Sequence, residues 1–276
     1  MILCRFHNEL EQPSRQNIIS VGQFTIVHKL NNKTVRKVPL KENYYYSTRA
    51  IEIEGRIYGH LGKSKRTAQC IRWGDGFVDL RYESNGDLES YLKKTPLTSN
   101  TKYRLAQQAI EAVAFIHERD VIHSDLSARQ FLVDKSYNIR LSDFGGSSLQ
   151  GSDAIVMENA THFLPRDESA PNTVQSDIFA LGSTVYEILL GEKPYEGMED
   201  EEIQRLFSDK VFPKLDGIRD QQWRNIIQKC WTCQYSRARD ILEDIPSVPR
   251  FRCILARIQS TFPNARLRPI NNRVQG

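Results

Sequence analysis

Residues 121–145 read VIHSDLSARQFLVDKSYNIRLSDFG, and this stretch holds three groups suited to phosphoryl transfer. Asp125 is the acid of a His-Ser-Asp triplet, Gln130 supplies an amide five residues later, and Asp143 opens an Asp-Phe-Gly triplet. Phosphoryl transfer asks for a carboxylate that orients a hydroxyl, oxygen ligands for magnesium and a cation on the phosphates. We therefore expect the rest of the chain to supply a lysine, its acidic partner and a nucleotide pocket.

Length and composition are those of an ordinary globular protein with a sizeable core. The chain has 276 residues, of which 39% are hydrophobic and 26% charged. Its formal net charge of +4 is too small to indicate a nucleic-acid partner. The positive charge is concentrated at the end, where residues 246–276 hold six arginines and no acid, so residues 1–245 carry about −2.

Two interpretations of this basic end remain open. It forms a final helix followed by a solvated end, or it binds an acidic partner or a membrane surface. The six arginines are Arg250, Arg252, Arg257, Arg266, Arg268 and Arg273.

The cysteines do not form a pattern typical of a secreted, disulfide-bonded protein, because there are five of them without regular spacing. Cys230 and Cys233 make a single C-x-x-C motif, which we interpret as two helix residues, at least one of them packed, rather than as a metal or redox site. The N-terminus lacks the long apolar region of a secretory signal. No uninterrupted apolar run of 18 or more residues exists, so we expect no membrane span. We expect an intracellular, cytoplasmic protein, with a nuclear location not excluded.

The first part of the chain predicts strands and one helix. Residues 18–38 predict three short strands, with a turn at Asn31-Asn32-Lys33, and residues 68–82 predict two more around Gly74-Asp75-Gly76. Residues 47–61 predict a helix with Ser47 or Thr48 as its cap. One face of this helix would carry Ile51, Glu54, Tyr58 and Leu61.

After a break at Ser84-Asn85-Gly86, the pattern becomes helical. We expect helices over residues 103–117, 174–190 and 223–233, and a short hairpin made by FLVD and NIRLSD. Strands first and helices second, around one cleft, predict an α+β fold.

Over roughly residues 15–245 the chain resembles the eukaryotic-type protein kinases, whose motifs are H-R-D-L-x-x-x-x-N and D-F-G. The resemblance implies a bilobal fold, with a small antiparallel β-rich N-lobe that carries one helix and a larger helical C-lobe. It implies a single kinase domain over residues 1–276, with the N-lobe at about 10–83, the C-lobe at about 84–260 and a basic tail at 261–276.

The resemblance also implies roles for five residues. Lys37, in T-V-R-K, matches the strand lysine that neutralises phosphate oxygens, and Glu54 matches its helical partner. Asp125 would be the catalytic base that accepts or orients the hydroxyl proton. Asp143 would bind Mg²⁺, and Gln130 would be both a catalytic residue and a second metal ligand.

The nucleotide pocket is implied in the same way. Residues 20–27, SVGQFTIV, keep one glycine of the family's G-x-G-x-x-G-x-V loop, and residues 80–88 resemble the segment that joins the two lobes. Leu80 falls at the gatekeeper position, backbone groups of Arg81 and Glu83 would bond the adenine edge, and Asp87 would reach a ribose hydroxyl. The implied pocket residues are Gly22, Val27, Val35, Lys37, Glu54, Leu80, Arg81, Glu83, Asp87 and Leu132.

The chain departs from the family pattern at several positions. Ser124 replaces the arginine of H-R-D, which makes this a non-RD sequence, and Gln130 replaces the asparagine. Arg166 stands where the family has the glutamate of A-P-E, and Ala238 stands where it has that glutamate's arginine partner. The buried ion pair of typical kinases is therefore lost or rebuilt. The Leu-Pro-Arg ending and small size resemble compact, divergent kinase-like proteins of filamentous fungi.

The resemblance implies a protein kinase that uses ATP and Mg²⁺ on a protein substrate. The alternatives are an ATP-binding pseudokinase that acts as a scaffold, and a small-molecule kinase of the aminoglycoside phosphotransferase type. Asp177, in D-I-F-A-L-G, would brace the catalytic loop and favours the first reading. We favour Ser/Thr over Tyr substrates, although Ser127 replaces the usual lysine of Ser/Thr kinases and Arg129 resembles tyrosine kinases. The oligomeric state is left open.

Overall fold

The computed structural model describes residues 17–41, 44–167 and 169–245. These residues belong to one compact unit that ends at Ile245. The first residues of the predicted N-lobe (10–16), the end of the predicted C-lobe (246–260) and the basic tail (261–276) lie outside the described residues, and with them all six arginines of residues 246–276.

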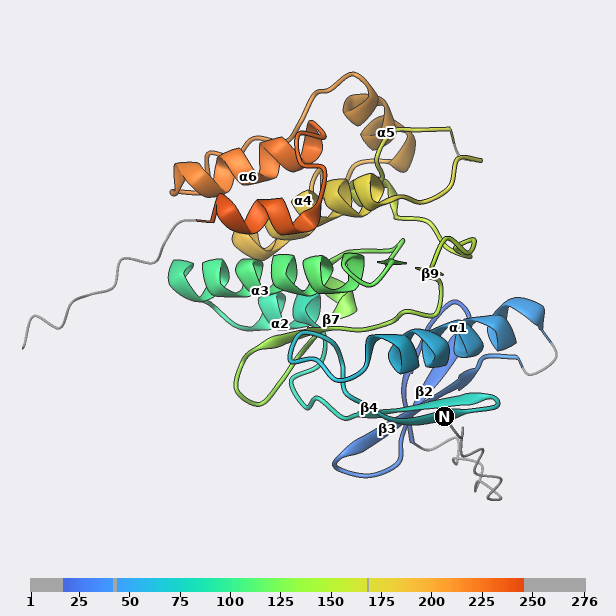
Figure 1. The fold of residues 1–276 in the computed structure, drawn as a ribbon. Coiled ribbons are helices and arrows are strands. Elements are labelled where there is room, and N and C mark those ends of the chain that lie inside the picture. The colour runs from blue at the N-terminus through green and yellow to red at the C-terminus, as the bar shows by residue number, and fades with distance from the viewer. Residues whose placement is uncertain (1–16, 42–43, 168, 246–276) are drawn as a thin grey trace, which may run out of the picture. The chain divides into compact units, whose positions relative to one another are not determined.

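Residues 18–81 form a five-stranded antiparallel sheet with one helix beside it (Figure 1). The strand order is β1-β2-β3-β5-β4, so β5 pairs with β3 and β4 is the edge strand beside β5. The elements are β1 (Ile18–Val21), β2 (Thr25–Lys29), β3 (Thr34–Pro39), α1 (Tyr45–Leu61), β4 (Cys70–Gly74) and β5 (Phe77–Arg81).

The predicted turns place these strands in register. The side chain of Asn31 accepts a hydrogen bond from the backbone of Lys33 at 2.8 Å, which closes the turn between β2 and β3. Gly76 has φ +78° in the turn between β4 and β5, a conformation that glycine adopts without strain. The resulting register pairs Val27 with Lys37, and Lys37 with Val78.

Helix α1 presents the predicted apolar face to the sheet, and Ile51, Glu54, Tyr58 and Leu61 are all buried. The predicted cap is wrong: the helix begins at Tyr45, and Tyr44 is the N-cap without a side-chain hydrogen bond. Ser47 is instead buried inside the first turn. Tertiary burial therefore fixes the start of this helix in place of a capping side chain.

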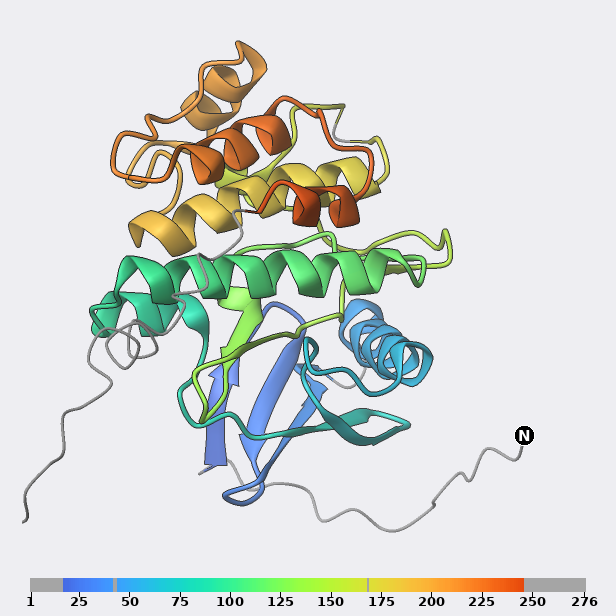
Figure 2. The same ribbon diagram turned by 60° about the vertical axis from the view of Figure 1, so that its left-hand side comes forward.

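The part of the chain after β5 is mostly helical and contains two short pairs of strands, β6 with β9 and β7 with β8. Figures 1 and 2 show α3 next to α4, and α6 on the other side of α4. The helices are α2 (Leu88–Lys94), α3 (Ser99–His117), α4 (Val174–Leu190), α5 (Asp200–Ser208) and α6 (Gln221–Trp231). The strands are β6 (Val121–Ile122), β7 (Phe131–Val133), β8 (Ile139–Leu141) and β9 (Ser148–Leu149).

Helix α4 is the centre of the C-terminal half and has the predicted bounds. All its residues from Ser176 to Leu189 are buried. One of its polar side chains is paired with α6: the Trp231 indole N–H donates to the Ser183 hydroxyl at 3.0 Å. A capping box of Thr173 and Ser176 starts the helix, and Gly191 ends it with φ +92°.

The cysteine prediction is half right. Cys230 is buried in α6, as expected, but Cys233 is exposed, lies beyond the end of that helix at Trp231, and has φ +55°. Both thiols are free, and among the described residues no cluster of His, Cys, Asp or Glu could hold a metal.

The structure confirms the bilobal α+β architecture, with an antiparallel sheet and one helix in one lobe and a helical second lobe. The helices described for this chain include none with the length and apolar character that crossing a bilayer demands.

Because α4 and α6 pack closely at Gly182, we expect one added methyl group there to lower the free energy of unfolding. A Cβ added at Gly182 would lie 2.6 Å from the Cβ of Cys230, so Gly182→Ala forces the helices apart. We expect the variant to lose about 1–2 kcal/mol of unfolding free energy even after the helix-propensity gain of alanine. Urea unfolding measures this, and Gln222→Ala on the exposed side of α6 is the control. Unchanged stability in Gly182→Ala would show that the two helices are not in close contact.

Candidate active site

A cavity of about 610 Å³ between the two lobes gathers most of the predicted site residues. Glu54 does not line it, because it lies buried behind Lys37. The predicted residues that do line it are Gly22, Val27, Val35, Lys37, Leu80, Arg81, Glu83, Asp87, Asp125, Gln130, Leu132 and Asp143.

The ammonium group of Lys37 lies between two carboxylates from different parts of the chain. Its Nζ is 2.6 Å from Oε2 of Glu54 on α1 and 2.7 Å from Oδ1 of Asp143. Strand β3 therefore holds one cation that joins the N-lobe helix to the start of the Asp-Phe-Gly triplet.

The surroundings of the three groups perturb their ionisation. Burial lowers the pKa of Lys37, but the charges of Asp143 and Glu54 outweigh it and raise that pKa overall. The Lys37 charge holds the pKa of Asp143 below its usual range, with burial opposing. Burial raises the pKa of Glu54 against the opposing charge of Lys37. At neutral pH the cation is therefore firmly retained.

The two carboxylates are not equivalent. The Glu54 side chain is 0% exposed, whereas that of Asp143 is 51% exposed and lines the cavity. Asp143 is thus the carboxylate that can meet a ligand, and Glu54 is the one that holds the lysine. Phe144, next to Asp143, is buried edge-on against the ring of Tyr58 at 5.2 Å between centroids, which fixes the triplet against α1.

Asp125 and Gln130 are joined by a hydrogen bond. The amide Nε2 of Gln130 donates to Oδ2 of Asp125 at 2.5 Å, and the guanidinium of Arg129 is 3.6 Å from the same oxygen. Gln130 is positioned by the 3₁₀ turn η2 (Ala128–Gln130), and its backbone oxygen accepts hydrogen bonds from Ser142. Because the amide nitrogen is used, the amide oxygen is the atom left for another ligand. Burial raises the pKa of Asp125.

The loop that carries Asp125 is held by the buried side chain of Asp177. Its Oδ2 accepts the backbone N–H of His123 at 2.7 Å, and its Oδ1 accepts that of Ser124 at 2.9 Å. His117 also contacts Oδ2 at 2.9 Å. Ser124 has φ +73°, so a buried carboxylate stabilises a backbone conformation that serine seldom adopts.

The segment joining the lobes offers backbone groups to the cavity. The N–H of Glu83 has no hydrogen-bond partner among the described residues. The N–H of Arg81 donates to the carbonyl of Gln69 at 2.9 Å, which leaves only its own carbonyl for a ligand. Asp87 caps α2 by accepting the N–H of Ser90 at 2.8 Å, so one of its carboxylate oxygens is already engaged.

The loop between β1 and β2 covers the cavity with a tight turn, in which the N–H of Gly22 donates to the carbonyl of Thr25 at 2.8 Å. A Cβ added at Gly22 would be 3.6 Å from that carbonyl oxygen, an ordinary contact. The fold alone therefore does not require glycine here, and any requirement comes from a bound group.

The ion pair lost at Ala238 is rebuilt within residues 158–172. Arg166 is 2.8 Å from Oε2 of Glu158, whose side chain is 0% exposed, and it also bonds the side chain of Asn172. Its guanidinium stacks on Phe163, 4.5 Å from the ring centroid. Arg166 thus anchors this segment by an ion pair in which position 166 carries the positive charge, whereas the family pattern has a glutamate there with an arginine partner.

The site has contributors that were not predicted, and Arg129, Val156 and Tyr58 are three of them. Arg129 was noted only for substrate class, yet it lines the cavity beside Asp125. Val156 reaches the cavity from the segment after Asp-Phe-Gly, and no local sequence signal indicates this. Tyr58 was placed only on the buried face of α1. Its position one helical turn after Glu54 could have indicated its contact with Phe144.

Comparison with known proteins agrees with this geometry. The family described as protein tyrosine and serine/threonine kinase matches residues 67–245. The chain is 32% identical to the carbon catabolite-derepressing protein kinase of Secale cereale, over 69% of this chain and 41% of that protein. It is 30% identical to the serine/threonine-protein kinase PDK1 of Cryptococcus neoformans, over 49% of this chain and 12% of that protein. It is 28% identical to the tyrosine protein-kinase src-1 of Caenorhabditis elegans, over 62% of this chain and 35% of that protein.

The chain belongs to the eukaryotic-type protein kinase family. Its matches to these three relatives span between 12% and 41% of their lengths.

The buried position of Glu54 predicts a pH-dependent penalty when Lys37 is removed. Lys37→Met leaves a buried carboxylate without its cation, which costs about 3–5 kcal/mol when the carboxylate is charged. Below pH ~4.3 Glu54 is protonated in both states and the penalty is small. As the pH rises, the unfolded chain loses that proton first, so the stability of the variant falls relative to the wild type.

Urea unfolding between acid and neutral pH measures this difference. Adding Glu54→Gln to Lys37→Met removes the buried charge of Glu54, and we expect it to restore most of the lost stability and to remove the part of the pH dependence that comes from Glu54. A Lys37→Met penalty that does not change with pH would contradict the buried ion pair.

Proposed function

We propose that this chain transfers the γ-phosphate of ATP to a hydroxyl group of a protein. The observation that carries the proposal is one cavity that holds a buried lysine paired to Glu54 and Asp143, opposite an Asp125–Gln130 pair. A cation, two acids and an amide are the groups that phosphoryl transfer requires.

The residues fit a triphosphate and a divalent cation. Lys37 stays charged and lies at the cavity wall, where it would contact phosphate oxygens. The half-exposed carboxylate of Asp143 and the amide oxygen of Gln130 are hard oxygen ligands of the kind that Mg²⁺ takes. A bound Mg²⁺ would supply charge neutralisation for the phosphates. The apolar walls from Val27, Leu80 and Leu132 suit an adenine ring.

Asp125 would orient the attacking hydroxyl and accept its proton. The Gln130 amide holds the Asp125 carboxylate in place, and burial raises the pKa of Asp125, which makes it a better base than an exposed aspartate. Asp177 supports this role indirectly, because it fixes the backbone of the loop just before Asp125.

We propose Ser/Thr hydroxyls of a protein as the acceptors. Among the relatives, PDK1 is named a serine/threonine-protein kinase, src-1 is named a tyrosine protein-kinase, and the name of the carbon catabolite-derepressing protein kinase gives no hydroxyl class. Arg129 lies beside Asp125 and favours a tyrosine acceptor as the alternative. Phosphoamino-acid analysis of the product distinguishes the two.

A second candidate is an ATP-binding pseudokinase that acts as a scaffold. The supporting observation is Gln130, whose side chain is one methylene longer than asparagine and is already engaged with Asp125. Because Mg²⁺ demands near-ideal octahedral geometry, a displaced ligand lowers catalysis while nucleotide binding persists.

Transfer of labelled phosphate from γ-labelled ATP to a mixed protein substrate tests the proposal. Asp125→Asn keeps the size of the side chain and removes its basicity, so we expect transfer to fall about 10²–10⁴-fold. Asp216→Asn, on the exposed surface of the C-lobe, is the matched control and keeps full activity. Equal rates in wild type and Asp125→Asn would overturn the assignment of the base.

Gln130 sets the level of activity. In Gln130→Asn the amide is one methylene shorter and leaves room for a metal ligand at the distance the family uses, so we expect kcat to rise and the Mg²⁺ requirement to sharpen. Steady-state kinetics across a range of Mg²⁺ concentrations measure both. A fall in kcat would show that the longer amide is matched to this site.

Activity should not depend on phosphorylation of the segment after Asp-Phe-Gly. Ser124 provides no cation there, and Ser147, Ser148 and Thr161 are buried, whereas Ser152 is exposed. We expect phosphatase treatment to leave the rate within twofold, since no arginine-ordered phosphate is available to remove. Ser152→Ala is the matched variant, and a large loss from either treatment would contradict this view.

A further inference from the structure

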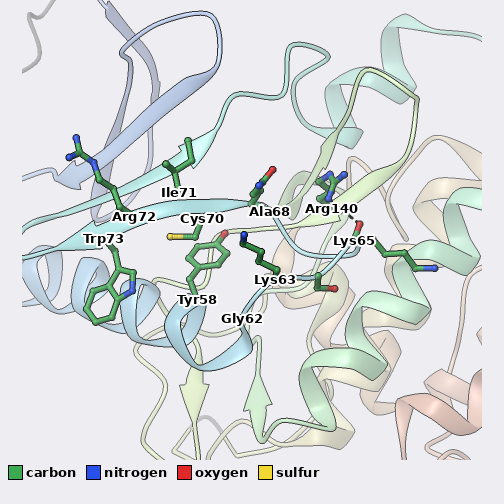
Figure 3. Close-up of a pocket in the computed structure, with 12 residues that line it drawn as sticks. Tyr58, Gly62, Lys63, Lys65, Ala68, Cys70, Ile71, Arg72, Trp73 and Arg140 are labelled. Carbon is green, nitrogen blue, oxygen red and sulfur yellow. Dashed lines mark hydrogen bonds between the residues drawn. The ribbon is translucent and has the colours of Figure 1, made fainter. Parts of the chain in front are cut away.

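Helix α1 meets different parts of the chain at its two ends. Its C-terminal end borders a cavity of about 650 Å³ beside Trp73 and β4 (Figure 3). That cavity shares no lining residue with the cavity that holds Asp125. The N-terminal end of α1 contacts instead the loop between β1 and β2, which lines the Asp125 cavity.

The loop between β1 and β2 has little buried surface. Residues 17–23, which include all of β1, are exposed. The N–H of Gly22 donates to the carbonyl of Thr25 at 2.8 Å, and this hydrogen bond fixes the shape of the turn but not its position over the cavity. Segments with few buried apolar contacts open at a low cost in free energy. The position of the loop therefore depends on the residue at which burial begins.

Burial begins at Phe24, which is held on two sides. Phe24 is half-buried, and the next residue, Thr25, is buried. The backbone carbonyl of Phe24 accepts the N–H of Leu40 at 2.7 Å, which ties Phe24 to the chain just after β3. The Phe24 ring stacks on the ring of Tyr46, with 6.0 Å between centroids and 25° between planes. Because Phe24 also lines the Asp125 cavity, this stack joins the cover of the cavity to the start of α1.

Tyr46 belongs to a run of three tyrosines whose rings contact one another. Its ring centroid is 5.7 Å from that of Tyr44 and 5.4 Å from that of Tyr45. These three residues are between 43% and 69% exposed, so they contribute little to the core. Core packing therefore does not explain the aromatic residues here, whereas the contact with Phe24 gives Tyr46 a role at the cavity.

Tyr46 stands on a helix whose position is fixed by its other turns. Glu54, farther along α1, is 2.6 Å from the ammonium group of Lys37. Ala50 is buried, and a Cβ added at Gly145 would lie 3.3 Å from it, so α1 also packs closely on the Asp-Phe-Gly triplet. The contact between Phe24 and Tyr46 therefore positions the loop against the helix, and not the helix against the loop.

We propose that Tyr46 is a positioning residue whose ring keeps the loop between β1 and β2 over a nucleotide bound in the Asp125 cavity. The retention of nucleotide rests on the function proposed above, whereas the contact between Phe24 and Tyr46 does not. A loop held over the cavity must open before the nucleotide leaves, so loss of the stack speeds release. An aromatic pair of this kind changes an equilibrium by about 2- to 10-fold.

Hydrogen–deuterium exchange without nucleotide tests the contact by itself. Tyr46→Leu removes the ring and keeps an apolar side chain at an exposed helix position. We expect the amides of residues 20–25 to exchange about 2- to 10-fold faster in this variant, and those of α4 to exchange as in the wild type. Tyr46→Phe keeps the ring and restores the wild-type rates. Tyr45→Leu removes a ring from the same turn but not the partner of Phe24, and is the matched control.

Release of a fluorescently labelled ATP tests the consequence for the cavity. The label is bound in the presence of Mg²⁺ and displaced by an excess of unlabelled ATP. We expect Tyr46→Leu to raise the dissociation rate about 2- to 10-fold, with a smaller change in the association rate. Tyr46→Phe and Tyr45→Leu keep the wild-type rate. Phe24→Leu also raises the rate, and adding Tyr46→Leu to it has no further effect, because the same contact is already lost.

Two results overturn the proposal. One is equal exchange of residues 20–25 in Tyr46→Leu and the wild type, which would show that the stack does not hold the loop. The other is an unchanged dissociation rate in Tyr46→Leu when the wild type binds labelled ATP, which would show that the loop does not retain the nucleotide. A wild type that binds no labelled ATP contradicts the proposed function instead, and the exchange measurement still decides whether Tyr46 positions the loop.

Discussion

A single ammonium group, that of Lys37, joins three parts of this protein. It is 2.6 Å from Glu54 on α1 and 2.7 Å from Asp143 after β8, while Lys37 itself belongs to the central strand β3. Because the side chain of Glu54 has no access to water, the lysine cannot move away without leaving a buried charge. The position of α1, the entry to the Asp-Phe-Gly triplet and the wall of the cavity are thus set by one interaction.

A second buried carboxylate, that of Asp177, fixes the backbone of the loop that carries Asp125. Asp177 accepts two consecutive backbone N–H groups and so stabilises Ser124 at φ +73°. Asp143 also has a positive φ, +65°. Such conformations cost of order 1–3 kcal/mol each and persist only where surrounding contacts enforce them. Ser124 directly precedes Asp125, and Asp143 contacts Lys37. The strained backbone therefore lies next to the side chains that we propose to bind the acceptor hydroxyl and the phosphates.

Sequence reasoning predicted most elements because local patterns are strong there. Residues 174–190 form an apolar run, so α4 has the expected bounds, and the resemblance to protein kinases implied that Lys37 pairs with Glu54. Tyr44 has no capping side chain, so nothing local marked the start of α1. The Arg166–Glu158 pair and the cavity beside Trp73 arise from tertiary contacts between residues whose separations carry no periodic signal.

The most direct test of this account is the effect of ATP with Mg²⁺ on the unfolding free energy of the whole chain. If Lys37 and Asp143 form a nucleotide site, a concentration one hundred times Kd stabilises the wild type by about 2.7 kcal/mol. The gain should be much smaller in a chain that carries Lys37→Met and Glu54→Gln together. This double variant removes both charges of the buried ion pair, so it leaves no buried charge without a partner. No stabilisation of the wild type at millimolar ATP and Mg²⁺, or an equal gain in both chains, would contradict the account.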